Sequence, residues 1–492
     1  MMKNYGKAAN KLDPSRFAIL SAGQLEDIHR ATLALLSNTG VQVDSKKARK
    51  LFASAGAKIE KKKAAKIVKI PASLVEECIN SAPGYQTYRG RLAKYDYRAE
   101  AGSYSFTTFG ECTGIIDLKT RAVRQSAKDD CCQSALICDY IDAVKVVERP
   151  LNPSDCPVAT QPLHNAEAIF SNTAKHSFIG PGNAESLKRM AKMAEACAAG
   201  SENFKDRKIF TATVCPLSPL TLGEDCCEII MEAARLGIGL LIFTMPLAGA
   251  TSAVTMAGTL VALNAEILSS LVLAQLAARG TPCTYGSAGT IMDLTMVDAA
   301  LGAPEMAVLS AAAAQLAHCY NLPSLVCGGM SDSKLPDAQT GYEFSYSAML
   351  CAMAAGNFIS GMGVLEKGIT FDYAKLLMDA EMADYIITAA SGIDTSPENL
   401  ALGTIDEAGP GGEFLTHDHT YNHMRSQSTV EKFDRRKRQD WLEAGGKDLA
   451  QKAYEEAAHI LAEHKPAPLP GKAAEIMADI IRQYEIELGI GK

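Results

Sequence analysis

Residues 240–249 read LLIFTMPLAG, an uncharged apolar run that ends in proline and small residues. Such a run is typical of a strand in a parallel sheet, because both faces of that sheet are buried. The same pattern, an apolar run followed by a small polar or glycine-rich turn, recurs through the second half of the chain, and alanine-rich helical stretches lie between the repeats. The other segments are HSFIGPG (176–182), IFTATVCPLSP (209–219), TPCTYGSAG (281–289), PSLVCGGMSDS (323–333) and NFISGMGVLEKG (357–368).

Apolar strands that alternate with helices predict an α/β fold with a closed (β/α)8 barrel, that is, a TIM barrel. We expect AVKVVER (143–149) to be the first strand and Leu402 to Glu407 to contain the eighth. Barrels of this kind place their chemistry at the carboxyl ends of the strands. The residues that follow the strands are therefore the first candidates for a functional site.

The flanking regions differ from the barrel in composition. Residues 1–100 combine helical periodicity with a lysine-rich stretch, so we expect an N-terminal helical extension. We predict a capping β-hairpin formed by Tyr104 to Ile116 and Arg121 to Gln125. This hairpin stands at the start of the barrel, and we place the barrel with its hairpin over residues 101–430. The polar, proline-broken residues 431–492 are predicted to form a C-terminal helical appendage.

Composition narrows the function classes. The 492-residue chain carries a net charge of −7, which argues against a nucleic-acid partner. Its N-terminus lacks the apolar core of a signal peptide, and we interpret the uncharged stretch 247–265 as a buried barrel helix and not as a membrane span. We therefore expect a cytoplasmic protein without membrane contact, whose 14 cysteines are reduced.

Some cysteines and histidines have metal-ligand chemistry. Cys215, Cys327 and His176 could converge on a zinc ion, but packing of the two cysteines inside the barrel is the preferred interpretation. The cluster His417, His419 and His423 lacks a fourth ligand and is interpreted as polar contacts. We expect no resident metal.

Aromatic residues are scarce, at 6% of the chain, yet several lie in loops near the expected barrel mouth. Aromatic faces attract quaternary ammonium groups through the ring quadrupole. Packing in the core is the competing interpretation for any one of these rings.

Residues 246–368 resemble the trimethylamine methyltransferase superfamily, and the resemblance continues into GPGGEFLTHDHTYNHM (409–424). The longest similar blocks are PLAGATSAVTMAGTLVALNAEILSSLVLAQLAARGTPCTYGS, APEMAVLSAAAAQLAHCYNLPSLVCGGMSDSKLPDAQTGYE and AAGNFISGMGVLEKGITFDYAKLLMD. The resemblance implies a TIM-barrel enzyme that moves a methyl group from an amine to the cobalt of a partner corrinoid (cobalamin) protein.

The trimethylamine enzymes of that superfamily carry pyrrolysine, whereas this chain contains only the twenty ordinary residues. It therefore looks like the non-pyrrolysine branch, which implies a quaternary amine substrate, with glycine betaine first and proline betaine or carnitine as alternatives. The chain has no DxHxxG motif, so the corrinoid would belong to a separate protein. We also expect a homo-oligomer.

Such a substrate implies a cage of rings with a carboxylate nearby, and donors for the substrate's own carboxylate. No catalytic residue is assigned. The candidate substrate-binding residues are Phe106, Phe109, His176, Tyr285, Ser287, Asp332, Phe344, Phe358 and Glu366.

Two other functions stay open. A zinc-dependent barrel methyltransferase or lyase would use Cys215 or Cys327 as a metal ligand. A non-catalytic barrel protein that only binds quaternary amines would need no catalytic residue at all.

Overall fold

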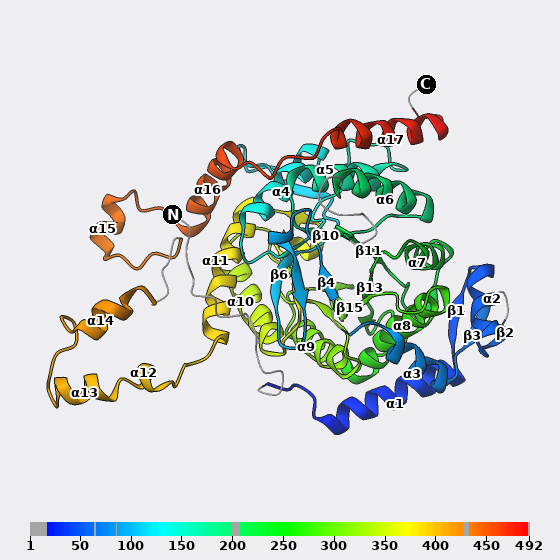
Figure 1. Ribbon diagram of the computed structural model, residues 1–492, viewed down its shortest axis with the longest axis horizontal. Helices are drawn as coiled ribbons and strands as arrows, with labels where there is room; N and C mark the ends of the chain where they lie inside the picture. Colours follow the sequence, from blue (N-terminus) through cyan, green and yellow to red (C-terminus); the bar gives the residue numbers. More distant parts are fainter. Residues whose placement is uncertain (1–16, 63–64, 85, 199–206, 427–431, 491–492) are drawn as a thin grey trace.

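The computed structural model describes residues 17–62, 65–84, 86–198, 207–426 and 432–490. Its centre is a parallel eight-stranded barrel with the ladder order β6-β19-β18-β15-β13-β11-β10-β9, and a parallel bridge between Phe106 and Val144 joins the first and last strands. The predicted TIM barrel is thus confirmed (Figure 1). The strands are β6 (Ser105–Thr108), β9 (Val146–Glu148), β10 (His176–Ile179), β11 (Phe210–Val214), β13 (Leu240–Thr244), β15 (Cys283–Ser287), β18 (Ser324–Cys327) and β19 (Phe358–Met362).

A ring of helices surrounds the strands, each helix following one strand in the chain (Figure 1). Among the described residues, one helix, α8, is long and apolar enough to cross a membrane, but 78% of its apolar window is buried inside the protein. Its burial against the barrel explains its composition. The helices are α4 (Lys128–Tyr140), α5 (Gln161–Asn172), α6 (Ala184–Ala198), α7 (Glu224–Leu236), α8 (Met256–Ala277), α9 (Pro304–Cys319), α10 (Ala338–Met353) and α11 (Tyr373–Ala390).

The prediction for the first barrel strand was wrong. The barrel begins with β6, and the segment 143–149 supplies the second strand in chain order. The sequence of β6, SFTT, alternates like a half-exposed hairpin strand, yet all four residues are buried. Their hydroxyls are satisfied inside the barrel, where Thr107 Oγ1 accepts from the Glu148 N–H at 2.9 Å. A hairpin does follow, formed by β7 (Gly114–Ile116) and β8 (Val123–Gln125).

The predicted eighth strand was also wrong. Residues Leu402–Ala408 form the exposed helix α13, and no strand follows Phe371 in the part of the chain that the structure describes. The stretch is too polar at Asp406 and Glu407 for a strand that is buried on both faces.

Short sheets cover the carboxyl ends of the barrel strands. One joins the β7–β8 hairpin to β21 (Thr370–Phe371) and β20 (Val364–Leu365), and another contains β14 (Leu247–Ala248), β16 (Thr290–Asp293) and β17 (Asp298–Ala300). The loops between these strands build the rim of the mouth.

The amino end of the barrel is closed by the hairpin of β4 (Gln86–Tyr88) and β5 (Tyr97–Ala99). The Tyr88 side chain is fully buried, bonds Thr284 Oγ1 at 2.6 Å and contacts the rings of Phe178 and Phe358 edge-on. This plug leaves the carboxyl end as the open end of the barrel.

The N-terminal region is more mixed than the expected helical extension. It contains α1 (Ala22–Asn38), α2 (Lys46–Ser54) and α3 (Ala72–Ser81), but also β1 (Val41–Val43) and a lysine-rich hairpin of β2 (Lys58–Lys62) and β3 (Ala65–Lys69). Helices α1 and α3 pack on α8.

The C-terminal region forms further helices. The helix α16 (Leu449–Glu463) packs on α4 and α11, and α17 (Ala473–Glu487) packs on α5 and α6. Between α11 and α16 an arm of short helices extends away from the barrel (Figure 1). Its helices are α12 (Pro397–Leu400), α13 (Leu402–Ala408), α14 (Asp418–His423) and α15 (Arg438–Glu443).

Candidate functional site

A cavity of about 500 Å³ lies at the carboxyl ends of the barrel strands. This volume is within the range of small-molecule sites, and the location is where barrel enzymes place their chemistry. The walls come from the ends of β6, β9, β10, β11 and β13 and from the loops of the rim. The lining residues are Phe109, Gly110, Glu111, Glu148, Arg149, Phe178, Gly180, Thr213, Cys215, Pro216, Leu217, Ser218, Phe243, Met245, Leu247, Thr251, Leu301, Lys367 and Gly368.

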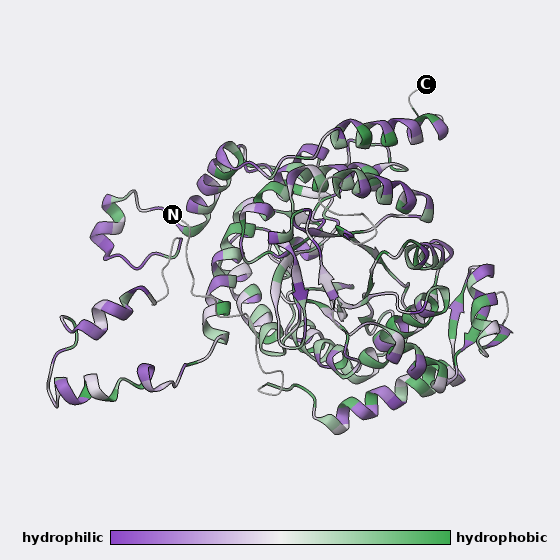
Figure 2. Cartoon of the chain, in the orientation of Figure 1, coloured by the Kyte–Doolittle hydropathy of each residue, from purple (hydrophilic) through white to green (hydrophobic). Residues whose placement is uncertain are grey.

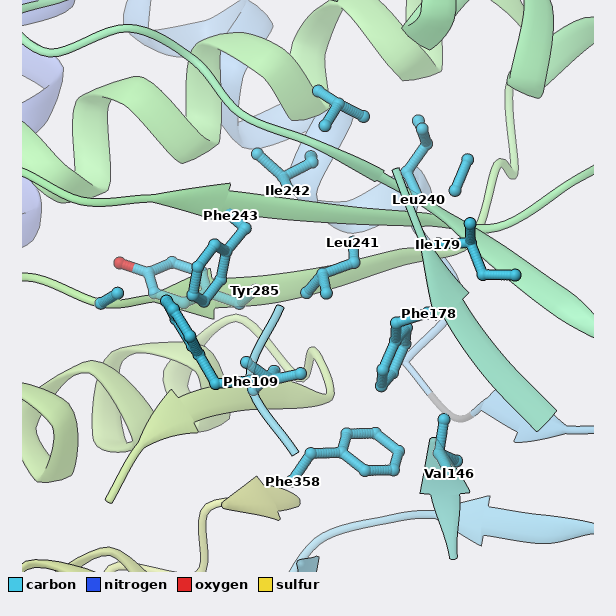
Figure 3. Packing of buried hydrophobic residues seen from close by; sticks show 14 of the residues in the cluster. Phe109, Val146, Phe178, Ile179, Leu240, Leu241, Ile242, Phe243, Tyr285 and Phe358 are labelled. Atoms are coloured by element: carbon cyan, nitrogen blue, oxygen red, sulfur yellow. The ribbon is translucent and has the colours of Figure 1, made fainter. Parts of the chain in front are cut away.

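Three phenylalanine rings form the apolar part of this wall. Phe109 and Phe243 lie side by side with ring centroids 6.0 Å apart, and Phe178 lies deeper in the barrel beside Phe358 (Figure 3). All three are buried and come from different strand ends. Rings that approach a cavity from different sides are suited to enclose a positive group.

Glu148 is a buried carboxyl on the same wall. It ends β9, where it is paired in register with Phe178 of β10, so both side chains point into the barrel. The Ser360 hydroxyl lies 2.8 Å from its Oε2 atom, and the Gly110 N–H also bonds the carboxyl. Burial raises the pKa of Glu148 to about 8, because these two hydrogen bonds offset only part of the desolvation.

Arg149 is a buried cation beside it. Its guanidinium pairs with the carboxylate of Glu111, whose side chain is 62% exposed. Burial lowers the pKa of Arg149 to about 10, which still leaves it charged at neutral pH. Gly110 allows this arrangement, since a Cβ at this position would lie 2.7 Å from the Arg149 carbonyl oxygen.

Two further polar groups face the cavity. The Cys215 thiol is open to the cavity, and its enclosed surroundings raise its pKa to about 11, so it stays neutral at physiological pH. Lys367 donates to Asp298 Oδ2 at 2.7 Å, and this bond raises the pKa of the lysine. The cavity thus combines aromatic faces, one carboxyl of raised pKa and one buried guanidinium.

Phe109 is the only candidate substrate-binding residue among the lining residues of this cavity. Tyr285 bonds Asn264 of α8 at 3.0 Å, so it faces outward, and Ser287 shares that face because it lies two residues along β15. Phe106 stacks on Phe344 of α10 with centroids 6.5 Å apart, which places both rings between the barrel and its helices.

Two of the other candidates lie at the amino end of the barrel. His176 begins β10, bonds Thr211 Oγ1 at 2.9 Å and has its pKa lowered to about 4 by burial. Phe358 begins β19 and packs on the Tyr88 plug. Both point into the barrel interior but lie at the end opposite to the mouth.

Asp332 and Glu366 lie next to the cavity without lining it. Asp332 accepts from the N–H of the lining residue Leu301 at 2.9 Å. Glu366 immediately precedes the lining residue Lys367 and accepts from Thr370 Oγ1 at 2.5 Å. Their carboxyls position the rim.

Sequence reasoning missed the charged residues of the cavity. Glu148 and Arg149 end the predicted strand AVKVVER, and two charges at the end of an apolar strand were the available signal. Phe178 and Phe243 lie within predicted strands, where a ring that lines a cavity looks the same as one that fills a core. Glu111 lies in the segment that was assigned to a capping hairpin.

The sulfur and imidazole groups of the described residues do not form a cluster of ligands. All fourteen cysteines are free thiols. Within the described ranges no group of three or more His, Cys, Asp and Glu side chains is arranged to hold a metal ion. His176 and Cys215 lie at opposite ends of the barrel, and the rings of His419 and His423 stack 4.1 Å apart on the arm.

Known proteins match the chain over nearly all of its length. The profile of the trimethylamine methyltransferase (MTTB) family matches residues 3–489. The trimethylamine methyltransferase MttB of Desulfitobacterium hafniense (strain DSM 10664 / DCB-2) is 44% identical over 469 residues, which cover 95% of this chain and 94% of that protein. The corresponding protein of Methanosarcina thermophila is 35% identical over 478 residues, covering 96% and 98%.

A relative whose name gives a different substrate is also similar. The glycine betaine methyltransferase of Desulfitobacterium hafniense (strain Y51) is 28% identical over 489 residues, covering 96% of this chain and 98% of that protein. Among solved structures, the hydroxylamine complex of MtmB aligns with a TM-score of 0.51 and 12% identity, covering 94% of this chain and 90% of that chain. At that identity the likeness concerns the fold.

Proposed function

Because the chain belongs to the trimethylamine methyltransferase (MTTB) family, as the resemblance in its sequence predicted, we propose that it transfers a methyl group from a quaternary amine, with glycine betaine as the first candidate, to the Co(I) of a corrinoid protein. The family is one of methyltransferases, and the choice of donor and acceptor is the proposal. The donor's C–N bond breaks, the amine keeps its electron pair, and the cobalt supplies the pair for the new bond to carbon.

One observation carries the choice of donor: the cavity holds rings, a carboxyl and a buried guanidinium together. The faces of Phe109, Phe178 and Phe243 suit a trimethylammonium group. Arg149 suits a carboxylate, because a guanidinium can hold both carboxylate oxygens. A betaine carries these two groups on one small molecule, whereas trimethylamine has no carboxylate that Arg149 could bind.

Exposed apolar residues on the rim are evidence in favour of a separate partner protein that carries the corrinoid. Leu217, Leu294 and Met296 are 61%, 66% and 71% exposed around the mouth. Leu294 lies on the β16–β17 hairpin, which Lys367 ties to the cavity edge through Asp298. Apolar side chains gathered at the entrance to a site are typical of a protein contact surface. A carrier seated there would present its cobalt to the donor.

Trimethylamine is the second candidate donor. It is favoured by the relatives that are 44% and 35% identical, both named trimethylamine methyltransferases. The chain has only the twenty ordinary residues, which supports the non-pyrrolysine branch and therefore the quaternary donor.

The test is an assay of the purified protein with chemically reduced cob(I)alamin and glycine betaine, proline betaine, carnitine or trimethylamine, read as methylcobalamin absorbance. Methylation from a quaternary amine and none from trimethylamine supports the proposal. Methylation from trimethylamine alone overturns it in favour of the second candidate. Binding without any methylation favours a barrel that only binds amines, and zinc bound stoichiometrically in the same sample would favour the zinc enzyme.

We also propose that the protein is cytoplasmic and forms a homo-oligomer. Its barrel domain would extend from about residue 100 to about residue 430, between an N-terminal and a C-terminal region. The support for the homo-oligomer is the arm, which extends away from the barrel and carries hydrophobic residues (Figure 2). Ile393, Leu402, Leu415 and Tyr421 of the arm are exposed. A second copy could cover these side chains. Light scattering of the purified protein tests this part, and a monomer would overturn it.

A further inference from the structure

Glu148 sits in a hydrogen-bond chain that depends on its protonation state. The Ser360 hydroxyl lies 2.8 Å from the Glu148 carboxyl and 2.8 Å from the carbonyl oxygen of Thr108. A carbonyl oxygen can only accept, and Ser360 has a single proton to donate. If Glu148 is ionised, both neighbours compete for that proton. If Glu148 is protonated, it donates to Ser360, Ser360 donates to Thr108, and both contacts are satisfied.

The same carboxyl faces the aromatic wall of the cavity. Its cross-strand neighbour Phe178 lines that wall, as do Phe109 and Phe243. An ionised carboxylate in this apolar setting lacks a countercharge until a cation enters, because the nearby Arg149 is paired with Glu111. A cation that fills the space between the rings would supply it.

Resting on the proposed function, we propose that Glu148 is the counter-ion of the donor's positive nitrogen, protonated in the empty cavity and ionised when the cation binds. Cation binding then releases one proton from the Glu148 carboxyl to solvent. Methyl transfer leaves a neutral tertiary amine, which is more basic than the carboxylate and takes one proton from solvent. When this protonated product leaves, the Glu148 carboxylate takes a proton from solvent in turn. The charge in the cavity is balanced at each step.

The other ionisable groups around Glu148 do not account for such a proton. Burial raises the pKa of Cys215 to about 11 and that of Cys327 well above its ordinary value. Both thiols therefore stay neutral near the pKa of Glu148. The pKa of Arg149 is about 10, and the pKa of Lys367 is raised by Asp298, so both stay protonated. Among the lining residues the other carboxylate is Glu111, which is exposed and paired with Arg149, and it serves as the control.

The experiment is isothermal titration calorimetry of the full chain with glycine betaine and with tetramethylammonium, in buffers of different ionisation enthalpy, from about pH 6 to about pH 9. Neither ligand's ammonium group can release a proton. We expect about one proton released per cation below the pKa of Glu148, and an affinity that rises about tenfold per pH unit until it levels off above that pKa. Glu148→Gln should abolish both effects, whereas Glu111→Gln should retain the proton release.

The Glu148→Gln variant keeps a donor for Ser360, and its thermal unfolding checks that it folds. Cation binding by the wild type without proton release, or proton release retained in Glu148→Gln, would overturn the counter-ion role. Methyl transfer from a quaternary amine together with pH-independent binding would overturn that role alone. Proton-linked binding without methyl transfer would overturn the proposed function alone. If neither cation binds, the counter-ion role is wrong, and the methylation assay judges the function separately.

Discussion

The buried guanidinium of Arg149 is paired with the carboxylate of Glu111, a residue whose own side chain is largely exposed and whose backbone has a φ of 105°. Non-glycine residues with such backbone angles are strained, and they concentrate at functional sites. On the proposed function, a substrate carboxylate that binds Arg149 would replace the Glu111 carboxylate as its partner.

We predict that Arg149→Met weakens glycine betaine binding by at least about 30-fold, or about 2 kcal/mol, because the substrate carboxylate loses its buried partner. Tetramethylammonium has no carboxylate, so its affinity should change by less than about threefold in the same calorimetric titration. Arg149→Lys is the matched control and should fall between, since lysine keeps the charge but loses the planar fork. Equal losses for both ligands would show that Arg149 acts only on the shape of the cavity.

The pair Phe109 and Phe243 gives a prediction about charge recognition. Phe243→Leu keeps an apolar side chain but removes the ring, so the variant should bind glycine betaine about 2- to 30-fold more weakly, which corresponds to about 0.5–2 kcal/mol for one cation–π contact. The uncharged analogue 3,3-dimethylbutanoate replaces the nitrogen with carbon, and its affinity should stay nearly constant. A parallel loss for both ligands would mean that Phe243 contributes only surface area.

Glu148 makes the stability of the empty protein depend on pH. Its folded pKa is about 8, above the usual value of 4.5, so the unfolded chain gives up this proton first. Stability must then fall as the pH rises between these values, with a slope of about 1.4 kcal/mol per pH unit for one group, and must level off above the folded pKa. Urea unfolding should therefore show Glu148→Gln gaining stability relative to the wild type across this range.

The control for that series is Glu111→Gln. Because the Glu111 side chain is 62% exposed, the difference in unfolding free energy between Glu111→Gln and the wild type should vary much less with pH. A difference between Glu148→Gln and the wild type that stays constant with pH would mean that Glu148 is ionised in the empty cavity.

Most of the barrel could be predicted because its strands are buried on both faces and read as uncharged apolar runs. The strand Ser105–Thr108 was not predicted to belong to the barrel because it contains serine and threonine. Their hydroxyls find partners inside the barrel, among them the Glu148 backbone. Hydroxyls satisfied by tertiary contacts leave no trace in the local pattern.

The same property that reveals the strands conceals the site. A strand that is apolar on both faces does not show which of its residues point inward, so Tyr285 and Ser287 were placed at the mouth although they face α8. Position along a strand was equally ambiguous for His176, which begins its strand. Phe109 lines the cavity because it directly follows the barrel strand β6, although the sequence pattern had assigned that strand to a capping hairpin.

The buried pair Lys375 and Asp379 yields the last prediction, on the stability of the rim. Lys375 Nζ donates to Asp379 at 2.6 Å and to the Gly329 carbonyl at 3.3 Å, and Asp379 accepts from the Gly363 N–H at 2.9 Å. The pair thus ties the loops that follow β18 and β19. Lys375→Met should cost about 3–5 kcal/mol in chemical unfolding, because it leaves a buried carboxylate unpaired. Adding Asp379→Asn should recover part of that loss, since the amide keeps an acceptor for Gly363 without a charge. If Lys375→Met and the double variant were equally stable, the loss of stability would come from the released loops and not from the unpaired charge of Asp379.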